Sequence, residues 1–250
     1  MNKADVLDLF DSRMRADPPK KEGIERLWFD GILRTTGAYN FIGWWNVPEG
    51  RTSEIVYREA AYFRDRGGVE WQVYDHDRPA GLEAVLADAG FIDPSQETFL
   101  VADVAELRLA MVPPVGFQIS RVYDDVGLAD YASASAAAFG NGDLAGIEHY
   151  RSRLTDPTLA LYVAYVNGSP VASGRLELPE DRPFAGLWDG GTVSDFRGRG
   201  VYRALVAARV AEARSRGARY VYVDARETSR PILERLGFEA IATMRGWTLA

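Results

Sequence analysis

Residues 193–202 read Val193-Ser194-Asp195-Phe196-Arg197-Gly198-Arg199-Gly200-Val201-Tyr202. This order predicts the end of a strand, a basic glycine loop and the start of a helix. The two glycines allow backbone N–H groups to approach a ligand closely, and a helix start carries unpaired N–H groups and a partial positive charge. Arginines add bidentate donors. The stretch therefore predicts a site for a phosphate or pyrophosphate.

Two common phosphate-binding loops do not fit this stretch. No Gly-Lys-Ser/Thr follows, which excludes a Walker A loop. No third glycine comes three residues after Gly200, which excludes the dinucleotide-binding fingerprint. Solvated basic turns share this composition, so the flanking sequence has to decide between a site and an ordinary turn.

The flanking sequence has the periodicity of an α/β structure. Strand residues precede the loop, and apolar residues at helical spacing follow it. These residues are Val201, Ala204, Leu205, Ala208, Val210 and Ala211. Residues 219–224 then form an aromatic and β-branched stretch typical of a strand, and residues 229–236 predict a short helix with Gly237 as its C-cap.

With these elements in place, residues 116–250 resemble a GCN5-related N-acetyltransferase (GNAT) domain. Arg197-x-x-Gly200-x-Tyr202 matches the family's loop for the coenzyme A pyrophosphate, and residues 231–238 match its last helix, which ends in Leu236-Gly237-Phe238. The resemblance implies an α+β (mixed α/β) fold with a central, mostly antiparallel, splayed sheet flanked by helices. It also implies acetyl-CoA as the cofactor.

The resemblance assigns the cofactor-binding residues. Thr192 and Val193 are expected to offer backbone groups to the pantetheine arm. The loop residues expected to hold the pyrophosphate are Arg197, Gly198, Arg199, Gly200, Val201, Tyr202 and Arg203. Two positions depart from the family pattern. Tyr202 replaces a small residue, and Leu233 stands where many members have a tyrosine that protonates the leaving thiolate.

Three residues are candidates for proton transfer. Asp189, just upstream of the loop, is the first candidate for the base and Glu177 the second, although either could be a surface charge. Ser229 could donate to the thiolate or could cap the helix that follows it. Gly190-Gly191 is consistent with a bulge that splays the strand, or with an ordinary turn.

Composition limits the other classes of function. The 250 residues carry a net charge of −7, which argues against a general nucleic-acid binder. There is no cysteine, and two histidines are too few for a convincing metal site, so no metal is expected. No apolar stretch is long enough to span a membrane, so a cytoplasmic protein without a membrane partner is expected. A homodimer is one option for its assembly.

The chain is expected to divide at a Pro- and Gly-containing linker, residues 112–115, between domains 1–111 and 116–250. The second domain is expected to contain helices at 125–139 and 143–155, a hairpin around Asn167-Gly168 and a last strand at 239–249.

The first domain repeats part of this pattern. Arg66-Gly67 before one strand and Arg216-Gly217 before another lie 150 residues apart, and both halves have a Gly-Phe ending after a helix. Duplication explains these matches, although chance recurrence in α/β proteins is the alternative. The equivalent loop, residues 46–52, has one glycine, a proline and Glu49. The first domain is therefore expected to be a degenerate copy without cofactor binding.

Two further features of the first domain have a structural interpretation. Its many large aromatic residues could form a wall of a substrate cleft, but core packing is the simpler interpretation. His76, which lies among charged residues, fits a solvated loop after a strand better than a catalytic role.

The sequence thus predicts an N-acetyltransferase. It would move an acetyl group from acetyl-CoA to a primary amine of a small molecule or amino-acid-like substrate, by direct attack in a ternary complex. The alternative is a non-catalytic acyl-CoA-binding or protein-interaction module.

Overall fold

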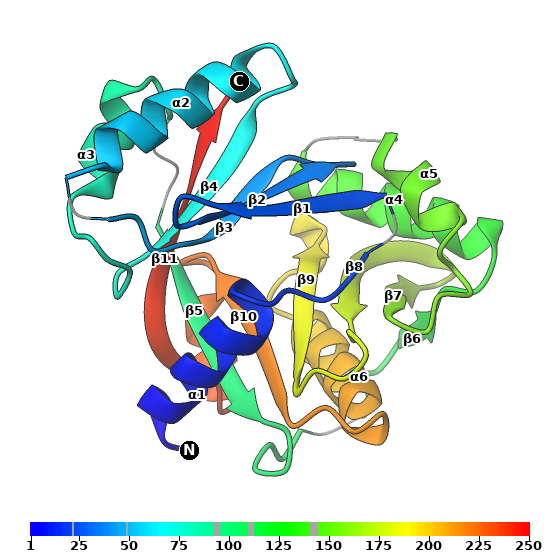
Figure 1. Ribbon diagram of the computed structural model, residues 1–250. Coiled ribbons are helices and arrows are strands. Elements are labelled where there is room, and N and C mark those ends of the chain that lie inside the picture. Colours follow the sequence, from blue (N-terminus) through cyan, green and yellow to red (C-terminus); the bar gives the residue numbers. More distant parts are fainter. Residues whose placement is uncertain (22, 49, 93–95, 110–112, 141–144) are drawn as a thin grey trace. The chain divides into compact units, whose positions relative to one another are not determined.

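The structure is a computed structural model that describes residues 1–21, 23–48, 50–92, 96–109, 113–140 and 145–250 (Figure 1). The chain forms two compact units. Unit 1 contains residues 1–100, 224–230 and 240–250, and unit 2 contains residues 101–223 and 231–239. This division differs from the single break predicted at 112–115, because two C-terminal segments belong to unit 1. Residue 112 of the predicted linker lies outside the described residues.

Unit 1 has a sheet with the strand order β1-β2-β3-β4-β11. The β1–β2, β2–β3 and β4–β11 pairs are antiparallel, and β3–β4 is parallel. Its elements are α1 (Lys3–Phe10), the π-helix η1 (Asp11–Arg15), β1 (Ile24–Phe29), β2 (Ile32–Gly37), β3 (Phe41–Trp45), α2 (Thr52–Arg64), β4 (Val69–Tyr74), α3 (Leu82–Asp88), the start of β5 (Glu97–Asp103) and most of β11 (Glu239–Leu249).

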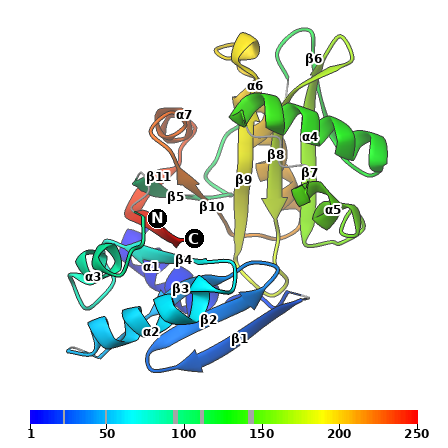
Figure 2. The ribbon, with the colours of Figure 1, turned by 90° about the horizontal axis from the view of Figure 1, so that it is seen from above.

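Unit 2 has a sheet with the strand order β6-β7-β8-β9-β10. Its first three pairs are antiparallel, and β9–β10 is parallel. Its elements are β6 (Phe117–Arg121), α4 (Asp125–Phe139), α5 (Ala145–Arg151), β7 (Leu159–Val166), β8 (Ser169–Glu177), β9 (Phe184–Thr192), the 3-10 turn η2 (Ser194–Phe196), α6 (Val201–Ser215), most of β10 (Tyr220–Ala225) and most of α7 (Arg230–Arg235). Figure 2 shows α4 in front of β7–β9 and α6 behind them.

Several local predictions for unit 2 are confirmed. The 125–139 helix has the predicted bounds, and β7 and β8 are joined by Asn167-Gly168, whose φ angles of 49° and 78° suit a tight hairpin turn. The helix expected from residue 143 is α5, and its first two predicted residues lie outside the described ones. The α7 helix ends at Arg235, Gly237 follows it with φ +100°, and the Phe238 N–H donates to the Leu233 carbonyl, as in a Schellman cap.

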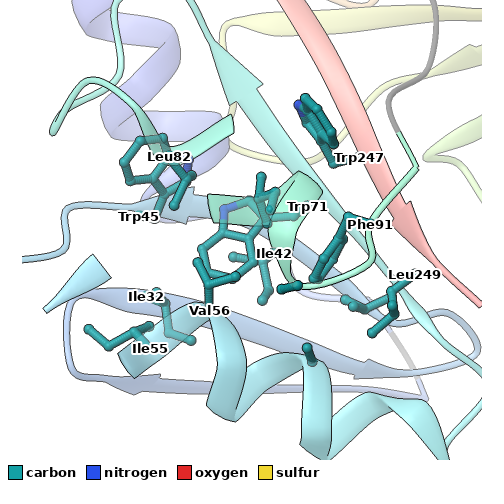
Figure 3. Packing of buried hydrophobic residues seen from close by; sticks show 14 of the residues in the cluster. Ile32, Ile42, Trp45, Ile55, Val56, Trp71, Leu82, Phe91, Trp247 and Leu249 are labelled. Carbon is teal, nitrogen blue, oxygen red and sulfur yellow. The ribbon is translucent and has the colours of Figure 1, made fainter. Parts of the chain in front are cut away.

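The last strand is the main departure from the sequence-based fold. Residues 239–249 were predicted to complete the second domain, but residues 244–249 of β11 pair with β4, and Trp247 lies opposite Trp71. Trp247 and Leu249 are buried in the core of unit 1 (Figure 3). The core of unit 1 thus depends on a segment from the far end of the chain.

The aromatic residues of unit 1 fill this core. Trp45, Trp71 and Tyr74 are buried, which confirms core packing for these three. The fully enclosed Trp71 packs edge-on against Phe91 at a centroid separation of 6.3 Å. Burial of such large rings supplies much of the stability of a unit of this size.

His76 does not lie in a solvated loop. Its Nε2 is 2.8 Å from Asp11 Oδ2, and Arg15, at the end of η1, makes a bidentate ion pair with the buried Asp77. Burial lowers the pKa of His76, but the hydrogen bond and charge of Asp11 raise it by more, so the net pKa is raised. The cluster ties η1 to the end of β4.

Among the residues described, no helix is both long and apolar enough to cross a membrane.

Candidate functional site

The loop between β9 and α6 has the backbone of an anion-binding turn. Gly198 and Gly200 adopt left-handed φ angles of +73° and +84°, which favour glycine. A Cβ atom built on Gly198 would meet nothing within 4 Å, so the loop backbone is open on that side. The 15-residue helix α6 starts directly after Gly200, which provides no side chain to cap it.

The start of α6 presents unpaired donors and positive charge. Ala204 N–H bonds the Gly200 carbonyl at 3.1 Å, whereas the N–H groups of Val201 and Arg203 make no hydrogen bond within the described part of the chain. The first turn of α6 contains no acidic residue. The side chains of Arg199 and Arg203 are exposed beside it. These residues fit a pyrophosphate, because N–H groups, helix dipole and guanidinium charges act together.

Other loop residues have structural contacts of their own. Arg197 donates from Nε to the Thr192 carbonyl at 2.9 Å and from a terminal nitrogen to the Ala138 carbonyl at 3.2 Å, so it fixes the loop to β9 and α4. The Val193 N–H donates to the Val171 carbonyl, and the Val193 carbonyl accepts a hydrogen bond from the Phe196 N–H. The Thr192 carbonyl can still accept a second bond through its other lone pair.

Strand β9 contains a bulge upstream of the loop. Arg175 pairs with Trp188 and Ser173 pairs with Gly191, so two residues, Asp189 and Gly190, oppose Gly174 alone. Asp189 has φ +50°, which is uncommon for a residue other than glycine. The bulge predicted from Gly190-Gly191 is confirmed.

The other edge of β9 separates from β10. Their parallel pairing covers only three residue pairs and ends at Gly186 and Tyr222, although β9 continues to Thr192. The splay expected from the bulge is therefore present, and the second half of β9 has no β10 partner within unit 2. A strand edge of this kind offers backbone N–H and C=O groups to an extended ligand.

Asp189, on β9, lies close to polar side chains from three other elements, which are β8, α4 and α5. Its Oδ2 accepts from Arg175 Nε at 2.7 Å, and the hydroxyls of Tyr131 on α4 and Tyr150 on α5 lie 3.5 Å from the same oxygen. Arg175 also pairs with Glu177. The two candidate bases, Asp189 and Glu177, therefore both form ion pairs with Arg175.

Burial sets the electrostatics of this cluster. It raises the pKa of Tyr131 far above its usual value, with the charge of Asp189 adding to the effect, and it also raises the pKa of Tyr150. Both phenols therefore stay protonated and can donate. Burial lowers the pKa of Arg175, but Glu177 and Asp189 together raise it by more, so Arg175 stays charged. The Asp189 side chain is 40% exposed.

The candidate acid Ser229 and the departure from the family pattern at Leu233 lie in different units. Ser229 belongs to the 224–230 segment of unit 1, and its hydroxyl donates to the Arg226 carbonyl at 3.1 Å. Leu233 is fully buried in unit 2 and has no group that could give a proton.

The sequence alone did not indicate four members of the site. These are Tyr131, Tyr150, Arg175 and the buried Arg209 of α6. For Arg209 a signal was present: Val201, Leu205 and Arg209 follow at intervals of four, so helical spacing places the arginine on the buried stripe. The tyrosines are separated from Asp189 by 39 to 58 positions, and only the tertiary fold brings them together.

Comparison with known proteins agrees with this geometry. Residues 129–238 match the model of the acetyltransferase (GNAT) family. No curated protein sequence matches the chain.

Solved structures with the same fold cover nearly the whole chain. A GCN5-related N-acetyltransferase from Kribbella flavida has 16% identity over 98% of this chain and 93% of its own, with a TM-score of 0.67. A second from Sphaerobacter thermophilus has 15% identity over 100% and 93%, also with a TM-score of 0.67. A tandem GNAT protein from the clavulanic acid biosynthesis pathway has 14% identity over 87% and 78%, with a TM-score of 0.60.

The chain thus has the GNAT fold, and its residues 129–238 match the model of the acetyltransferase (GNAT) family.

Proposed function

We propose that unit 2 transfers an acetyl group from acetyl-CoA to a primary amine of a small molecule or amino-acid-like substrate, by direct attack in a ternary complex. One observation carries this proposal. A single strand, β9, has an anion-binding loop at its C-terminal end and, three residues earlier, a bulge that bears a carboxylate.

The donor side uses the loop. The N–H groups at the start of α6 and the side chains of Arg199 and Arg203 would hold the pyrophosphate, while Arg197 keeps the loop in shape. The Thr192 carbonyl and the unpaired edge of β9 would align the pantetheine arm. Bound acetyl-CoA would supply the thioester, whose acetyl carbon forms a bond to the amine nitrogen as its bond to sulfur breaks.

The acceptor side uses the Asp189 cluster. Two carboxylates, Asp189 and Glu177, share Arg175, and the Asp189 side chain is 40% exposed, so it can pair with an ammonium-bearing substrate. Asp189 would take the proton that the amine loses on attack. Leu233 has no proton to give, so the thiolate would be protonated by water.

Unit 1 has the same strand pattern but a different loop. In both units two antiparallel pairs precede a parallel pair, which supports a duplicated acetyltransferase fold. However, Glu54 lies in the first turn of α2, and Arg51, at its N-cap, pairs with Glu54 and Asp30. Because this helix start is already occupied by acidic groups, we propose that unit 1 binds no coenzyme A.

The role of Asp189 is tested with Asp189→Asn. If Asp189 is the base, kcat/KM for the amine should fall by about 100-fold or more, since general-base catalysis typically contributes that much. Coenzyme A binding should be unchanged. The measurement is thiol release with a panel of amines across a range of pH, with the exposed Glu180→Gln as the control.

Two outcomes would contradict this reading. Unchanged turnover and an unchanged pH profile in Asp189→Asn would eliminate it as the base. Coenzyme A binding by the wild type without thiol release for any amine would favour the non-catalytic acyl-CoA-binding module. The absence of a proton donor at the buried Leu233 is consistent with such a module.

A further inference from the structure

Arg209 is a buried cation directly beneath the β9 bulge. It lies in α6 and is only 1% exposed. No carboxylate pairs directly with it in the described part of the chain. A buried charge without an ionic partner is costly and is retained only where several hydrogen bonds satisfy it.

Its hydrogen bonds bridge the two strands at the bulge. One terminal nitrogen donates to the Arg175 carbonyl on β8 at 3.1 Å and to the Trp188 carbonyl on β9 at 3.2 Å. Nε donates to the Leu205 carbonyl at 3.2 Å, within its own helix. Arg175 and Trp188 are the last aligned pair before the register shift, so the guanidinium clamps both strands at that point.

Two glycines make room for this guanidinium. A Cβ atom on Gly174 would lie 2.8 Å from the guanidinium carbon, and one on Gly190 would lie 3.2 Å from a terminal nitrogen. Gly174 belongs to β8 and Gly190 to the bulge of β9. Both strands thus lack a side chain where Arg209 approaches them.

The clamp determines how the peptide between Trp188 and Asp189 is oriented. This peptide is trans, so its C=O and N–H point in opposite directions. Because the carbonyl points toward Arg209 and α6, the Asp189 N–H points away from α6. The hydrogen bond from a cation also polarises the peptide, which makes that N–H a stronger donor. In this orientation Asp189 adopts a left-handed φ angle, which is energetically unfavourable for a residue other than glycine.

We propose that Arg209 is a positioning residue of the acetyl-transfer site, which holds the bulged Trp188–Asp189 peptide so that its N–H polarises the thioester carbonyl. This inference rests on the proposed function of unit 2. Burial lowers the pKa of Arg209, and the nearby carboxylate of Asp189 opposes this shift.

The test is Arg209→Met, with Arg209→Lys as the conservative variant and Val210→Ala as the matched control. Val210 is the next residue of α6 and is equally buried, so its truncation weakens packing without touching the bulge. For Arg209→Met we expect kcat to fall about 10- to 100-fold, since misplaced catalytic groups typically cost this much, with the KM for acetyl-CoA within about twofold of wild type. Arg209→Lys should recover part of kcat.

A second readout needs no ligand. Hydrogen exchange of residues 187–191 should become faster in Arg209→Met and stay unchanged in residues 197–203, whereas Val210→Ala should not produce this local pattern. If Arg209→Met does not fold, Gly174→Ala displaces the guanidinium without removing it and should show the same two effects.

The outcomes separate this inference from the proposed function. Folded Arg209→Met or Gly174→Ala with the kcat and the 187–191 exchange of the control would overturn it. Wild-type protein that transfers no acetyl group to any amine would contradict the proposed function, and the exchange measurement would still decide whether Arg209 holds the bulge.

Discussion

Replacing Trp247 with alanine is expected to lower the free energy of unfolding of unit 1 by about 3–5 kcal/mol, the usual cost of truncating a large buried aromatic side chain. Trp247 is 5% exposed and lies opposite Trp71 in the β4–β11 pair. Because β11 supplies part of the core of unit 1, the loss should affect the first hundred residues although the mutation lies three residues before Ala250.

Chemical denaturation and hydrogen exchange by mass spectrometry check this expectation. In Trp247→Ala, exchange should rise in β4 and α2 and much less in β6–β8. Leu27→Ala removes a side chain that is 56% exposed and should change stability by no more than about 0.5 kcal/mol. Faster exchange confined to β6–β8 would show instead that the last strand stabilises the second half of the chain.

A second large effect is expected at Asp224. Its Oδ1 is enclosed without a hydrogen-bond partner in the described part of the chain. Burial, and then the charges of Glu97 and Glu70, raise the pKa of Asp224 to about 8, with Arg15 opposing them. The pKa of Glu97 and that of Glu70 are also raised, chiefly by burial.

The sign of the pH dependence follows from these values. An unfolded aspartate has a pKa of about 4, so between about pH 4 and pH 8 the folded state holds a proton that the unfolded state has lost. The stability of the wild type should therefore fall as pH rises through this range. Asp224→Asn removes this titration and is expected to raise the free energy of unfolding by about 5 kcal/mol at pH 8.5, with little change at pH 4.

Thermal and urea unfolding from pH 4 to pH 8.5 measure this difference. Asp8→Asn, the same substitution at an exposed position of unit 1, should leave the pH profile as in the wild type. A gain for Asp224→Asn that is equal at pH 4 and pH 8.5 would mean that Asp224 does not titrate in this range.

Local signals in the sequence predicted most of unit 2 and the loop before α6, which we propose binds acetyl-CoA. The glycine spacing at 198 and 200, the turn at Asn167-Gly168 and the cap at Gly237 each depend on neighbouring residues only, and each is found as expected. The 150-residue echo between the halves corresponds to a shared feature of both units, in which two antiparallel strand pairs are followed by a parallel pair.

The partner of the last strand could not be predicted in this way. Residues 239–249 have the alternation of any half-buried strand, and nothing local distinguishes pairing with β4 from pairing within the second domain. The cluster around Asp189, which we propose faces the amine substrate, could not be predicted either, because Tyr131, Tyr150 and Arg175 approach Asp189 only through tertiary packing. For Arg209 the helical spacing provided a signal, but that signal conflicts with the general rule that charged residues are not found on a buried helix stripe.

The central claim is that the chain has one working cofactor loop, at the start of α6. Isothermal titration calorimetry with coenzyme A, on the wild type and on two matched variants, tests it most directly. Gly198→Asp and Gly50→Asp place the same charge at left-handed glycines with open space around them, one in each loop. The account predicts one equivalent bound per chain, at least tenfold weaker binding in Gly198→Asp through repulsion of the phosphates, and unchanged binding in Gly50→Asp. Two equivalents per chain, or a loss of binding in Gly50→Asp alone, would contradict it.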